Sequence, residues 1–276
     1  MGATLTMPGH AHIDIALIGF GAIGQTVARL LHERGARARI VAVGLRDAAR
    51  TRPNLPPQAQ ILTHPAALAD SGAQLVVEVA GRDSVADWGH AALQAGQDFA
   101  VSSTSAFADA ALLQRMTALA RSTGARIIIP PGALGGIDAL AAGARMGLTS
   151  VEHRIIKPPA AWAGTEAEAA CDLDALDAPV AFFSGSADAA AARFARNANV
   201  ALITALAGLG PAQTRVTLIA DPTATGNRHE IDADGAFGEM RLQLANKALP
   251  DNPKSSALTA LSLVRLIENR VEPLVI

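Results

Sequence analysis

The chain has 276 residues, which is long for one hydrophobic core and comfortable for two domains. Half of its residues are hydrophobic and 17% are charged, a composition that excludes an intrinsically disordered chain. The net charge of −2, without a cluster of Lys and Arg, gives no reason to expect a nucleic-acid partner.

The N-terminal half alternates short hydrophobic runs with amphipathic stretches. Five runs predict buried strands, at 13–18, 40–43, 75–79, 99–101 and 127–129. Hydrophobic residues at helical spacing predict helices between these strands, at 23–31, 84–95 and 108–121. Strands that alternate with helices are typical of a Rossmann-type α/β domain, whose parallel sheet is covered on both faces.

The pattern changes after Pro131. Helices are predicted at 137–146, 187–196 and 200–209. Polar and hydrophobic residues alternate, as in half-exposed strands, at 151–156, 213–219 and 240–244. These elements indicate an α+β domain with a mixed or antiparallel sheet that has helices on one face. A last helix is predicted over 256–268, and we expect it to pack back onto the first domain.

The segment Gly19–Gly24 reads GFGAIG, a G-x-G-x-x-G motif that follows the first strand directly and opens the first helix. The motif needs glycine for a tight turn, for close approach of the backbone to a pyrophosphate, and for packing of the helix on the strand. The helix N-terminus then offers free N–H groups to the phosphates. A purely structural turn is the alternative. The context favours a dinucleotide site formed by Gly19, Gly21, Ala22, Ile23 and Gly24.

The end of the second strand bears on which dinucleotide is preferred. An NAD-specific site holds the ribose 2′-hydroxyl with an acidic residue there, about 20 residues after the glycines. Arg46 stands where a cation could meet the 2′-phosphate of NADP, while Asp47 is one residue late for the acidic role. If both are solvated loop charges, neither selects a cofactor. Because Arg46 can meet a 2′-phosphate, we expect the protein to use NADP and to tolerate NAD.

Three further segments follow strands of the first domain at the carboxyl edge, where such sheets bind their ligands. Ala80 follows the third hydrophobic run and Ser102 follows the fourth, and both are expected at the cofactor. The glycine-rich segment 131–138 follows the fifth run and contains Ala133. This segment either runs close to the ligand or acts as a hinge into the second domain, and the two interpretations are compatible.

Three segments of the second domain, 157–159, 196–200 and 221–230, are more polar than a core needs. His229 lies between a Gly-Asn turn and a strand, and it is a candidate acid or base because imidazole titrates near neutrality. Taken alone, such a residue is more often a turn histidine. His153, which lies on a strand, is expected to be an ordinary residue of the sheet face.

The chain resembles the L-aspartate dehydrogenase family in five segments that occur in the same order, at 19–24, 131–138, 197–200, 227–231 and 252–256. Any one of these motifs is unspecific, but five in register are hard to obtain by chance. The resemblance implies NAD(P)-dependent oxidation of L-aspartate to iminoaspartate. That imine feeds NAD biosynthesis or hydrolyses to oxaloacetate and ammonia.

The resemblance also assigns residues. It implies that Ala133 and Asn199 contact the nicotinamide cofactor and that His229 is the catalytic residue. One departure affects the cofactor: relatives often carry an acidic residue where this chain has Leu45 and Arg46. The resemblance therefore leaves the preference between NAD and NADP open.

The two carboxylates of aspartate need cationic or N–H partners. Lys157, Arg193 and Arg196 are candidates that the sequence does not separate, and we expect Lys157 and Asn227 at the substrate. Two rival functions stay open at this point. One is another two-domain dehydrogenase of the homoserine or sugar dehydrogenase type, and the other is a non-catalytic dinucleotide sensor.

Cys171 is the only cysteine, so neither an intrachain disulfide nor a metal site is expected, which fits the cytoplasm. The sequence carries neither a secretory signal nor a hydrophobic run of membrane-spanning length. We expect a cytoplasmic homodimer. Its expected domains are a dinucleotide-binding domain at 1–133, completed by the C-terminal helix at 255–276, and a catalytic, substrate and oligomerisation domain at 134–254.

Overall fold

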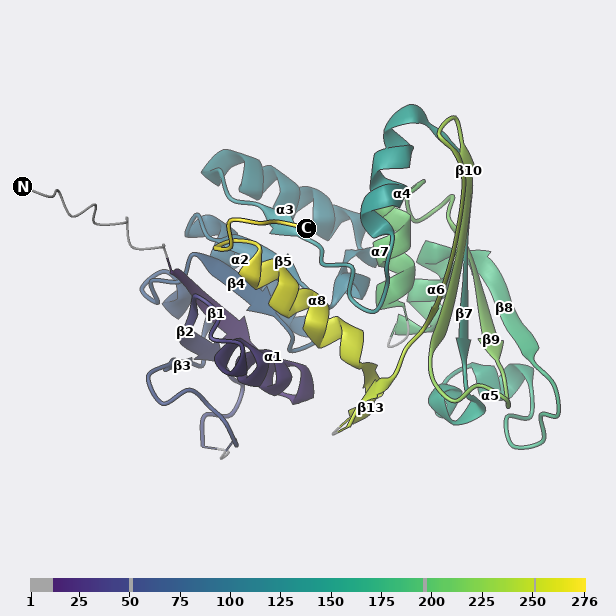
Figure 1. Ribbon diagram of the computed structural model, residues 1–276, viewed down its shortest axis with the longest axis horizontal. Helices are drawn as coiled ribbons and strands as arrows, with labels where there is room; N and C mark the ends of the chain where they lie inside the picture. Colours follow the sequence, from purple (N-terminus) through teal and green to yellow (C-terminus); the bar gives the residue numbers. More distant parts are fainter. Residues whose placement is uncertain (1–11, 50–51, 196–197, 251) are drawn as a thin grey trace, which may run out of the picture.

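The computed structural model describes residues 12–49, 52–195, 198–250 and 252–276. The chain forms two large sheets, and helices lie on both faces of the first and between the first and the second (Figure 1). The expected class, a Rossmann-type domain followed by an α+β domain, is confirmed. No helix of the described part of the chain is both long and apolar enough to cross a membrane.

The first sheet is parallel throughout, with the order β3-β2-β1-β4-β5-β6. Its strands are β1 (Ile13–Ile18), β2 (Ala38–Gly44), β3 (Gln60–Leu62), β4 (Leu75–Glu78), β5 (Asp98–Val101) and β6 (Ile127–Ile128). The chain order reverses between β1 and β4, and ligands of such sheets bind outside the carboxyl ends of the strands at this reversal.

Successive side chains of β1 point to opposite faces of the sheet, so the core of this domain has one part on each face. Ile15 and Leu17 face one side of the sheet and pack under α1 (Ala22–Glu33) and α8 (Ala257–Glu268). Ile18 faces the other side, under α2 (Val85–Gln94) and α3 (Ala110–Thr123). Short 3-10 turns complete the connections of the chain: η1 (Pro65–Leu68), η2 (Arg82–Ser84), η3 (Thr104–Ala108), η4 (Ala144–Met146) and η5 (Pro159–Trp162).

The second sheet is mixed, with the order β11-β10-β7-β9-β8, and only β7 and β9 run parallel. Its strands are β7 (Leu148–Lys157), β8 (Val180–Ser186), β9 (Arg215–Ala220), β10 (Arg228–Gly235) and β11 (Gly238–Ala245). The other elements of this half are α4 (Ile137–Gly143), α5 (Ala167–Ala170), α6 (Ala187–Arg193), α7 (Asn199–Ala207) and the hairpin strands β12 (Ala248–Leu249) and β13 (Asn252–Ser256).

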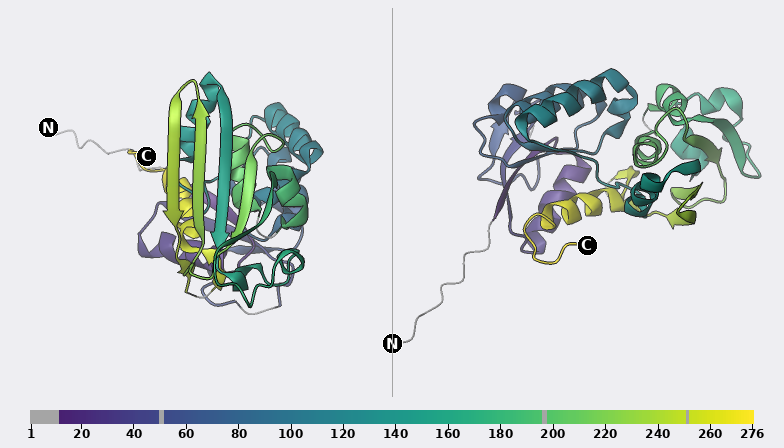
Figure 2. Two further views of the ribbon diagram at one scale, coloured as in Figure 1. Left: turned by 90° about the vertical axis from the view of Figure 1, so that its right-hand side faces the viewer. Right: turned by 90° about the horizontal axis from the view of Figure 1, so that it is seen from above.

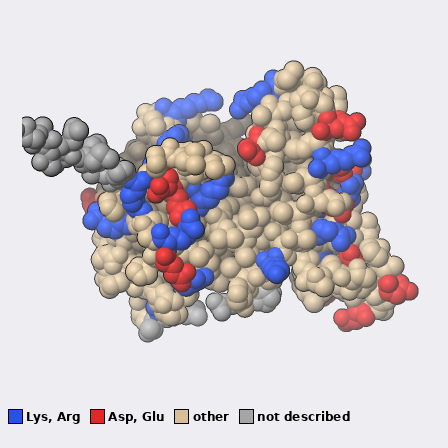
Figure 3. Space-filling view, viewed as in Figure 1, with Lys and Arg blue, Asp and Glu red and all other residues tan. Residues whose placement is uncertain are grey.

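Helices α4, α6 and α7 lie on the side of the second sheet that faces the first domain, whereas the opposite face is open (Figures 1 and 2). Acidic and basic side chains alternate across the open face, and both signs show at the right-hand edge of Figure 3. Ion pairs connect them, including Arg154 with Glu230 at 3.0 Å and Arg154 with Glu152 at 3.3 Å. Helices on one face of a mixed sheet were the sequence-based expectation.

Several strands were not predicted from the sequence. β3 has three residues, too few to show a period, and the pairing of β8 with β9 is irregular between Ala181 and Phe183. β10 begins at Arg228, inside the segment 221–230 that is more polar than a core needs. Helix ends also differ: α6 ends at Arg193 rather than 196, and the helix expected over 137–146 changes to a 3-10 turn after Gly143.

The chain passes twice between the two sheets. The first passage is the glycine-rich segment 131–138, in which Gly132 and Gly136 have φ values of 60° and 64°, a conformation that favours glycine. The second passage is the β12–β13 hairpin, which leads into α8 (Figure 1). Helix α8 then lies beside α1 on the first domain (Figure 2). Both chain ends therefore contribute to the first domain.

Candidate functional site

A cavity of about 130 Å³, here called the interdomain cavity, lies between the two sheets. Its walls come from the carboxyl edge of the first sheet, both passages between the sheets, α7, and the ends of β7 and β10. The lining residues are Ile23, Ser102, Gly132, Ala133, Lys157, Asn199, Val200, Ile203, Asn227, His229, Ser255, Ser256 and Thr259. Seven residues expected at the cofactor or substrate thus meet at one place: Ile23, Ser102, Ala133, Lys157, Asn199, Asn227 and His229.

The glycine-rich turn between β1 and α1 fits a dinucleotide. A Cβ on Gly19, whose φ is 96°, would lie 2.7 Å from Cα of Ala80, and one on Gly24 would lie 2.7 Å from the carbonyl oxygen of Gly19. The glycines at these two positions are therefore required by packing within the protein. A Cβ on Gly21 would meet no atom within 4 Å, so that position is open toward a ligand. Gly21, the N-cap residue of α1, has no side chain to cap the helix, which leaves the N–H groups there for a phosphate.

Glu78, at the end of β4, connects the two loops that follow β4 and β5. It is fully buried, and its carboxylate accepts N–H from Ala80 and Gly81 at 2.8 Å and from Ser103 at 2.9 Å. The hydroxyl of Ser103 lies 3.0 Å from the same carboxylate. Burial raises the pKa of Glu78, and the backbone N–H groups oppose that rise. These contacts fix the loop positions of Ala80 and, next to Ser103, of Ser102.

Hydrogen bonds across the domain boundary hold both residues that the resemblance assigns to the cofactor. Oδ1 of Asn199 accepts from the backbone N–H of Ser105 at 2.9 Å, so the group that Asn199 offers a ligand is its Nδ2 amide, a donor. The backbone oxygen of Asn199 accepts from Thr104 at 2.8 Å. The backbone oxygen of Ala133 accepts from Nδ2 of Asn246 at 2.8 Å.

His229 is the second residue of β10, and its ring is buried on the helix-covered side of the sheet. Nδ1 of His229 lies 3.2 Å from Nε2 of His153, and Nδ1 of His153 lies 3.0 Å from Oγ1 of Thr204 on α7. The expectation that His153 is an ordinary face residue is therefore wrong. Its neighbours on β7 show alternation, but alternation alone does not reveal that the buried side of this strand faces a second histidine.

Burial and one cation set the charges in the cavity. Burial, followed by the positive charge of Lys157, lowers the pKa of His229 to about 3. Burial also lowers the pKa of Lys157 to about 8. The idea that His229 titrates near neutrality is therefore wrong for the ligand-free protein, in which the imidazole is neutral. Nζ of Lys157 lies 5.0 Å from the ring centroid of Trp162, which gives the ammonium a favourable contact.

Arg193 and Arg46, two other cations expected near the site, do not line the interdomain cavity. Arg193 forms an ion pair with Glu166 at 2.7 Å and does not line the cavity, so it is withdrawn as a carboxylate partner. Arg46 is exposed just after β2, at the carboxyl edge but outside the interdomain cavity. Arg196 lies outside the described residues.

Sequence reasoning missed part of the lining. Ser255 and Ser256 belong to a segment that carried the family resemblance but received no role, and the motif itself was the available signal. Val200 belongs to the segment 197–200, which also carried the resemblance without a role for this residue, whereas Ile203 and Thr259 lie on helices whose spacing gives no sign of a ligand. Thr204 does not line the cavity but contacts His153, and it was missed because the spacing of α7 likewise gives no sign of this role.

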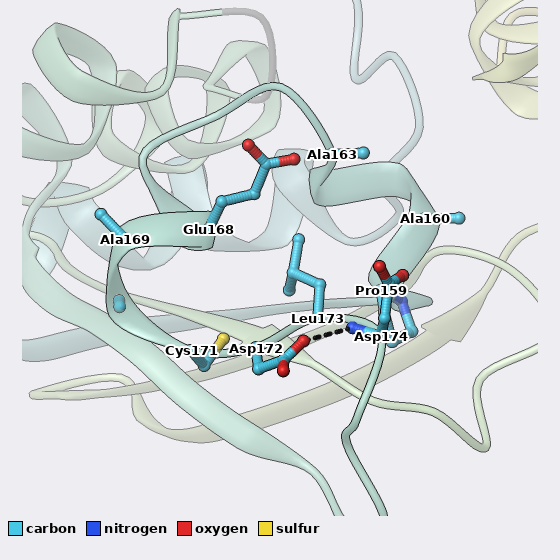
Figure 4. Close-up of a pocket in the computed structure, with 10 residues that line it drawn as sticks. Pro159, Ala160, Ala163, Glu168, Ala169, Cys171, Asp172, Leu173 and Asp174 are labelled. Carbon is cyan, nitrogen blue, oxygen red and sulfur yellow. Dashed lines mark hydrogen bonds between the residues drawn. The ribbon is translucent and has the colours of Figure 1, made fainter.

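A larger hollow of about 580 Å³ lies beside the loop after η5 (Figure 4). Its lining includes Glu168, Asp172 and Asp174, and the backbone N–H of Asp174 donates to Asp172 at 3.2 Å. No Lys or Arg is among the described residues that line it, so these carboxylates would repel an anionic substrate. Among the described residues, no group of three or more His, Cys, Asp or Glu is arranged to hold a metal ion.

Two family models match this chain, one on each side of the boundary between its two domains. A family model described as "Aspartate dehydrogenase, C-terminal" matches residues 138–270, and one described as "Homoserine dehydrogenase, NAD binding domain" matches residues 19–130. The half that carries Lys157 and His229 therefore matches an aspartate rather than a homoserine dehydrogenase.

Relatives match nearly the whole chain. L-aspartate dehydrogenase of Brucella anthropi is 58% identical over 95% of this chain and 98% of that protein. L-aspartate dehydrogenase of a Polaromonas species is 42% identical over 96% of this chain and 100% of that protein. The crystal structure of aspartate dehydrogenase from Thermotoga maritima, 26% identical, covers 96% of this chain and 99% of that chain, with a TM-score of 0.76.

Proposed function

Because the chain belongs to the L-aspartate dehydrogenase family, we propose that its interdomain cavity holds L-aspartate against the nicotinamide of NAD or NADP and oxidises it to iminoaspartate. The single observation that supports this reaction best is that a buried neutral imidazole, His229, and a buried ammonium, Lys157, line one cavity beside the dinucleotide-binding edge. The imine then hydrolyses to oxaloacetate and ammonia or feeds NAD biosynthesis.

The residues divide the work as follows. The nicotinamide, when bound, accepts the hydride that leaves Cα of the substrate. His229 accepts a proton from the substrate ammonium group, which frees the nitrogen lone pair to form the C=N bond. Lys157 holds a substrate carboxylate, and Asn227, which lines the same cavity, is a second polar contact for the substrate. Asn199 donates its Nδ2 amide to the cofactor, and Ala133 lines the same wall.

Substrate binding prepares the base. The charge of Lys157 lowers the pKa of His229 in the free protein. A carboxylate placed against Lys157 offsets that charge and adds a negative one nearby, so the pKa of His229 rises when aspartate binds. The imidazole therefore becomes a stronger base only in the complex that needs it.

The direct test is an activity assay with NADP and with NAD, using aspartate, glutamate, alanine and homoserine as substrates. Formation of the reduced nicotinamide is followed by its absorbance. Turnover of aspartate alone is expected. Turnover of homoserine instead would support the rival dehydrogenase, and tight cofactor binding without turnover of any of these substrates would indicate a dinucleotide sensor.

We further propose that Arg46 favours NADP. It is exposed at the carboxyl edge just after β2, where a 2′-phosphate would lie. Arg46→Ala is then expected to raise KM for NADP much more than KM for NAD. Arg39→Ala is the matched control, because Arg39 lies nearer the other end of β2 and pairs with Asp14. Equal changes in both KM values for Arg46→Ala would identify a solvated loop residue.

The domain limits and the assembly are proposals as well. Residues 1–133 with 255–276 would form the dinucleotide-binding domain, and 134–254 the substrate domain, which the packing of α8 on α1 supports. A cytoplasmic homodimer is supported by the single cysteine and by the open sheet face, whose opposite charges two copies can pair. Light scattering of the purified protein tests the dimer.

A further inference from the structure

Three side chains from three elements form a buried chain of contacts behind the interdomain cavity. Thr204 comes from α7, His153 from β7 and His229 from β10, and their exposed fractions are 0%, 0% and 1%. Only His229 lines the cavity. Because water does not reach the two other side chains, each donor and acceptor among them must be satisfied within the chain.

The direction of these hydrogen bonds follows from the first contact. Oγ1 of Thr204 lies 3.1 Å from the backbone oxygen of Val200, and a carbonyl oxygen can only accept. The hydroxyl therefore donates its single proton to Val200. Its oxygen is then left to accept, so Nδ1 of His153, 3.0 Å away, carries a proton and donates to Thr204.

The contact between His153 and His229 makes the tautomer of His229 depend on that of His153. Burial, followed by the neighbouring His229, lowers the pKa of His153 well below its usual value, so its ring is neutral and carries only the proton on Nδ1. Nε2 of His153 must then accept. Nδ1 of His229, at 3.2 Å, is the donor to it. A neutral His229 that is protonated on Nδ1 has a bare Nε2.

We propose that Thr204 and His153 are positioning residues that hold His229 in the tautomer with a bare Nε2, so that this nitrogen can accept the substrate proton. The proposal rests on the proposed oxidation of aspartate for its chemical consequence, but not for the tautomer itself. In the opposite tautomer, Nε2 of His229 would carry a proton and could not act as a base.

The test begins with Thr204→Val, which removes the hydroxyl and keeps the branched shape. Nδ1–H of His153 then has no acceptor, so the proton of His153 moves to Nε2 and drives the proton of His229 to its own Nε2. We expect kcat for aspartate to fall by about 10- to 100-fold, by analogy with the loss seen when the hydrogen-bond partner that orients a metal-binding histidine is removed. KM for the cofactor should be unchanged, and Thr204→Ser should restore most of kcat.

Thr214→Val is the matched control. Thr214 is also fully buried, and within the described part of the chain its hydroxyl has no hydrogen-bond partner. Removing that hydroxyl should leave kcat at the wild-type value. If Thr204→Val and Thr214→Val gave the same kcat, and if Thr204→Val left the tautomer of His229 unchanged, the proposal would be overturned.

A pair of substitutions separates the two contacts of His153. In His153→Gln the side-chain amide stands near the place of Nε2, so its oxygen can still accept from His229. In His153→Asn the amide stands near Nδ1 and cannot reach His229. We expect His153→Gln to keep more of kcat than His153→Asn when both proteins melt at similar temperatures. The reverse order would contradict the relay.

Nitrogen-15 NMR of the imidazoles measures the tautomer without any substrate. The signals lost in His229→Asn identify His229. In the wild type, Nδ1 of His229 should have the chemical shift of a protonated nitrogen and Nε2 that of a bare nitrogen. In Thr204→Val the shift of Nδ1 should move toward that of a bare nitrogen, and the shift of Nε2 toward that of a protonated one. A wild type with Nε2 protonated would refute the proposal. The predicted tautomer in a protein that fails to oxidise aspartate would instead contradict the substrate assignment.

Discussion

His229 is useful as a base only if the protein keeps its imidazole neutral without removing it from the substrate. Burial and the charge of Lys157 achieve the first, since they lower the pKa of His229 to about 3. Its place in the lining of the cavity achieves the second. The same burial makes the folded protein less stable at acidic pH. The unfolded chain binds a proton at His229 below about pH 6.5 and the folded chain does not, so stability falls as the pH drops from 6.5 toward 3.

His229→Asn tests both consequences. The amide of Asn stands near the position of Nδ1 and can still donate to His153, so we expect the fold and the affinity for NADPH to be retained. The kcat for aspartate should fall by about 10² to 10⁴-fold, the usual contribution of a positioned acid or base. The loss of stability between pH 6.5 and 3 should become smaller than in the wild type, as measured by urea unfolding at several pH values. Near-normal kcat in this variant would make His229 structural.

Lys157 presents a conflict between stability and binding. Its pKa falls from 10.5 to about 8 on folding, which corresponds to about 3 kcal/mol of unfavourable free energy when the folded protein holds it charged. Lys157→Met should therefore raise the unfolding free energy at pH 7, by at most that amount. It should raise KM for aspartate at least about 30-fold, because a buried substrate carboxylate loses its partner.

The effect of Lys157→Met on the free energy of unfolding should change with pH in one direction. Between pH 8 and 10.5 the unfolded chain binds a proton at this residue and the folded chain does not, so the wild type gains stability as the pH rises through that window. The advantage of the variant should shrink over the same range. Lys247→Met, at an exposed position, is the control and should change neither stability nor KM. A Lys157→Met variant with unchanged KM would exclude a role at the substrate.

The candidate site shows how far residue-scale prediction reaches. The glycine motif predicted Ile23, and the family resemblance predicted Asn199 and His229; all three line the cavity. The contact between His153 and His229 joins residues 76 apart in the chain, and it depends on β7 and β10 pairing in one register. The sequence of either strand alone does not determine how β7 and β10 are aligned. Positions set by pairing of distant strands therefore have to come from the fold.

At the scale of elements, one carboxylate joins two loops of the cofactor edge. The carboxylate of Glu78 accepts from N–H groups of Ala80, Gly81 and Ser103 and from the hydroxyls of Ser84 and Ser103. Glu78→Gln puts an NH₂ group among these donors, so at least one of them loses its acceptor. We expect the free energy of unfolding to fall by about 1–3 kcal/mol and Kd for NADPH to rise, because the loop that carries Ala80 is no longer fixed.

Asp98→Asn is the control for Glu78→Gln. Asp98 lies on the opposite edge of the same sheet, where it pairs with Arg126 at 2.7 Å and Arg270 at 2.8 Å. Its substitution should lower stability and leave Kd for NADPH unchanged. If Glu78→Gln lowered stability alone, Glu78 would support the sheet but not the cofactor site.

The predictability of elements depended on their length and burial. β1 and β4 are buried continuous runs, and both were predicted within a residue or two. The two-residue strand β12 has no period of its own, and its hairpin with β13 forms where the chain returns to the first domain. Such short elements are defined by their neighbours rather than by propensity.

At the scale of the whole molecule, the first domain is closed by the last helix of the chain. Ala260, Leu263, Val264 and Ile267 of α8 lie in the same hydrophobic cluster as α1 and the strands beneath it. Arg34, just after α1, pairs with Glu268 at 2.6 Å, which joins residues 234 apart in sequence. The hydrophobic spacing of 256–268 predicted the helix, but only the packing shows which face of which sheet it covers.

A matched pair of substitutions on α8 tests whether this closure stabilises the cofactor domain. Leu263 is fully buried between α8 and the first sheet, whereas Leu261 on the same helix is 47% exposed. Leu263→Ala should lower the free energy of unfolding by about 2–5 kcal/mol, since it removes buried methyl groups and leaves a cavity. Leu261→Ala should change it by about 0.5 kcal/mol or less. Bound NADPH should restore part of the lost stability in Leu263→Ala, because a ligand of the folded state adds its binding free energy to that state. Equal effects of the two substitutions, measured by urea unfolding, would show that α8 is not part of the core that supports the dinucleotide site.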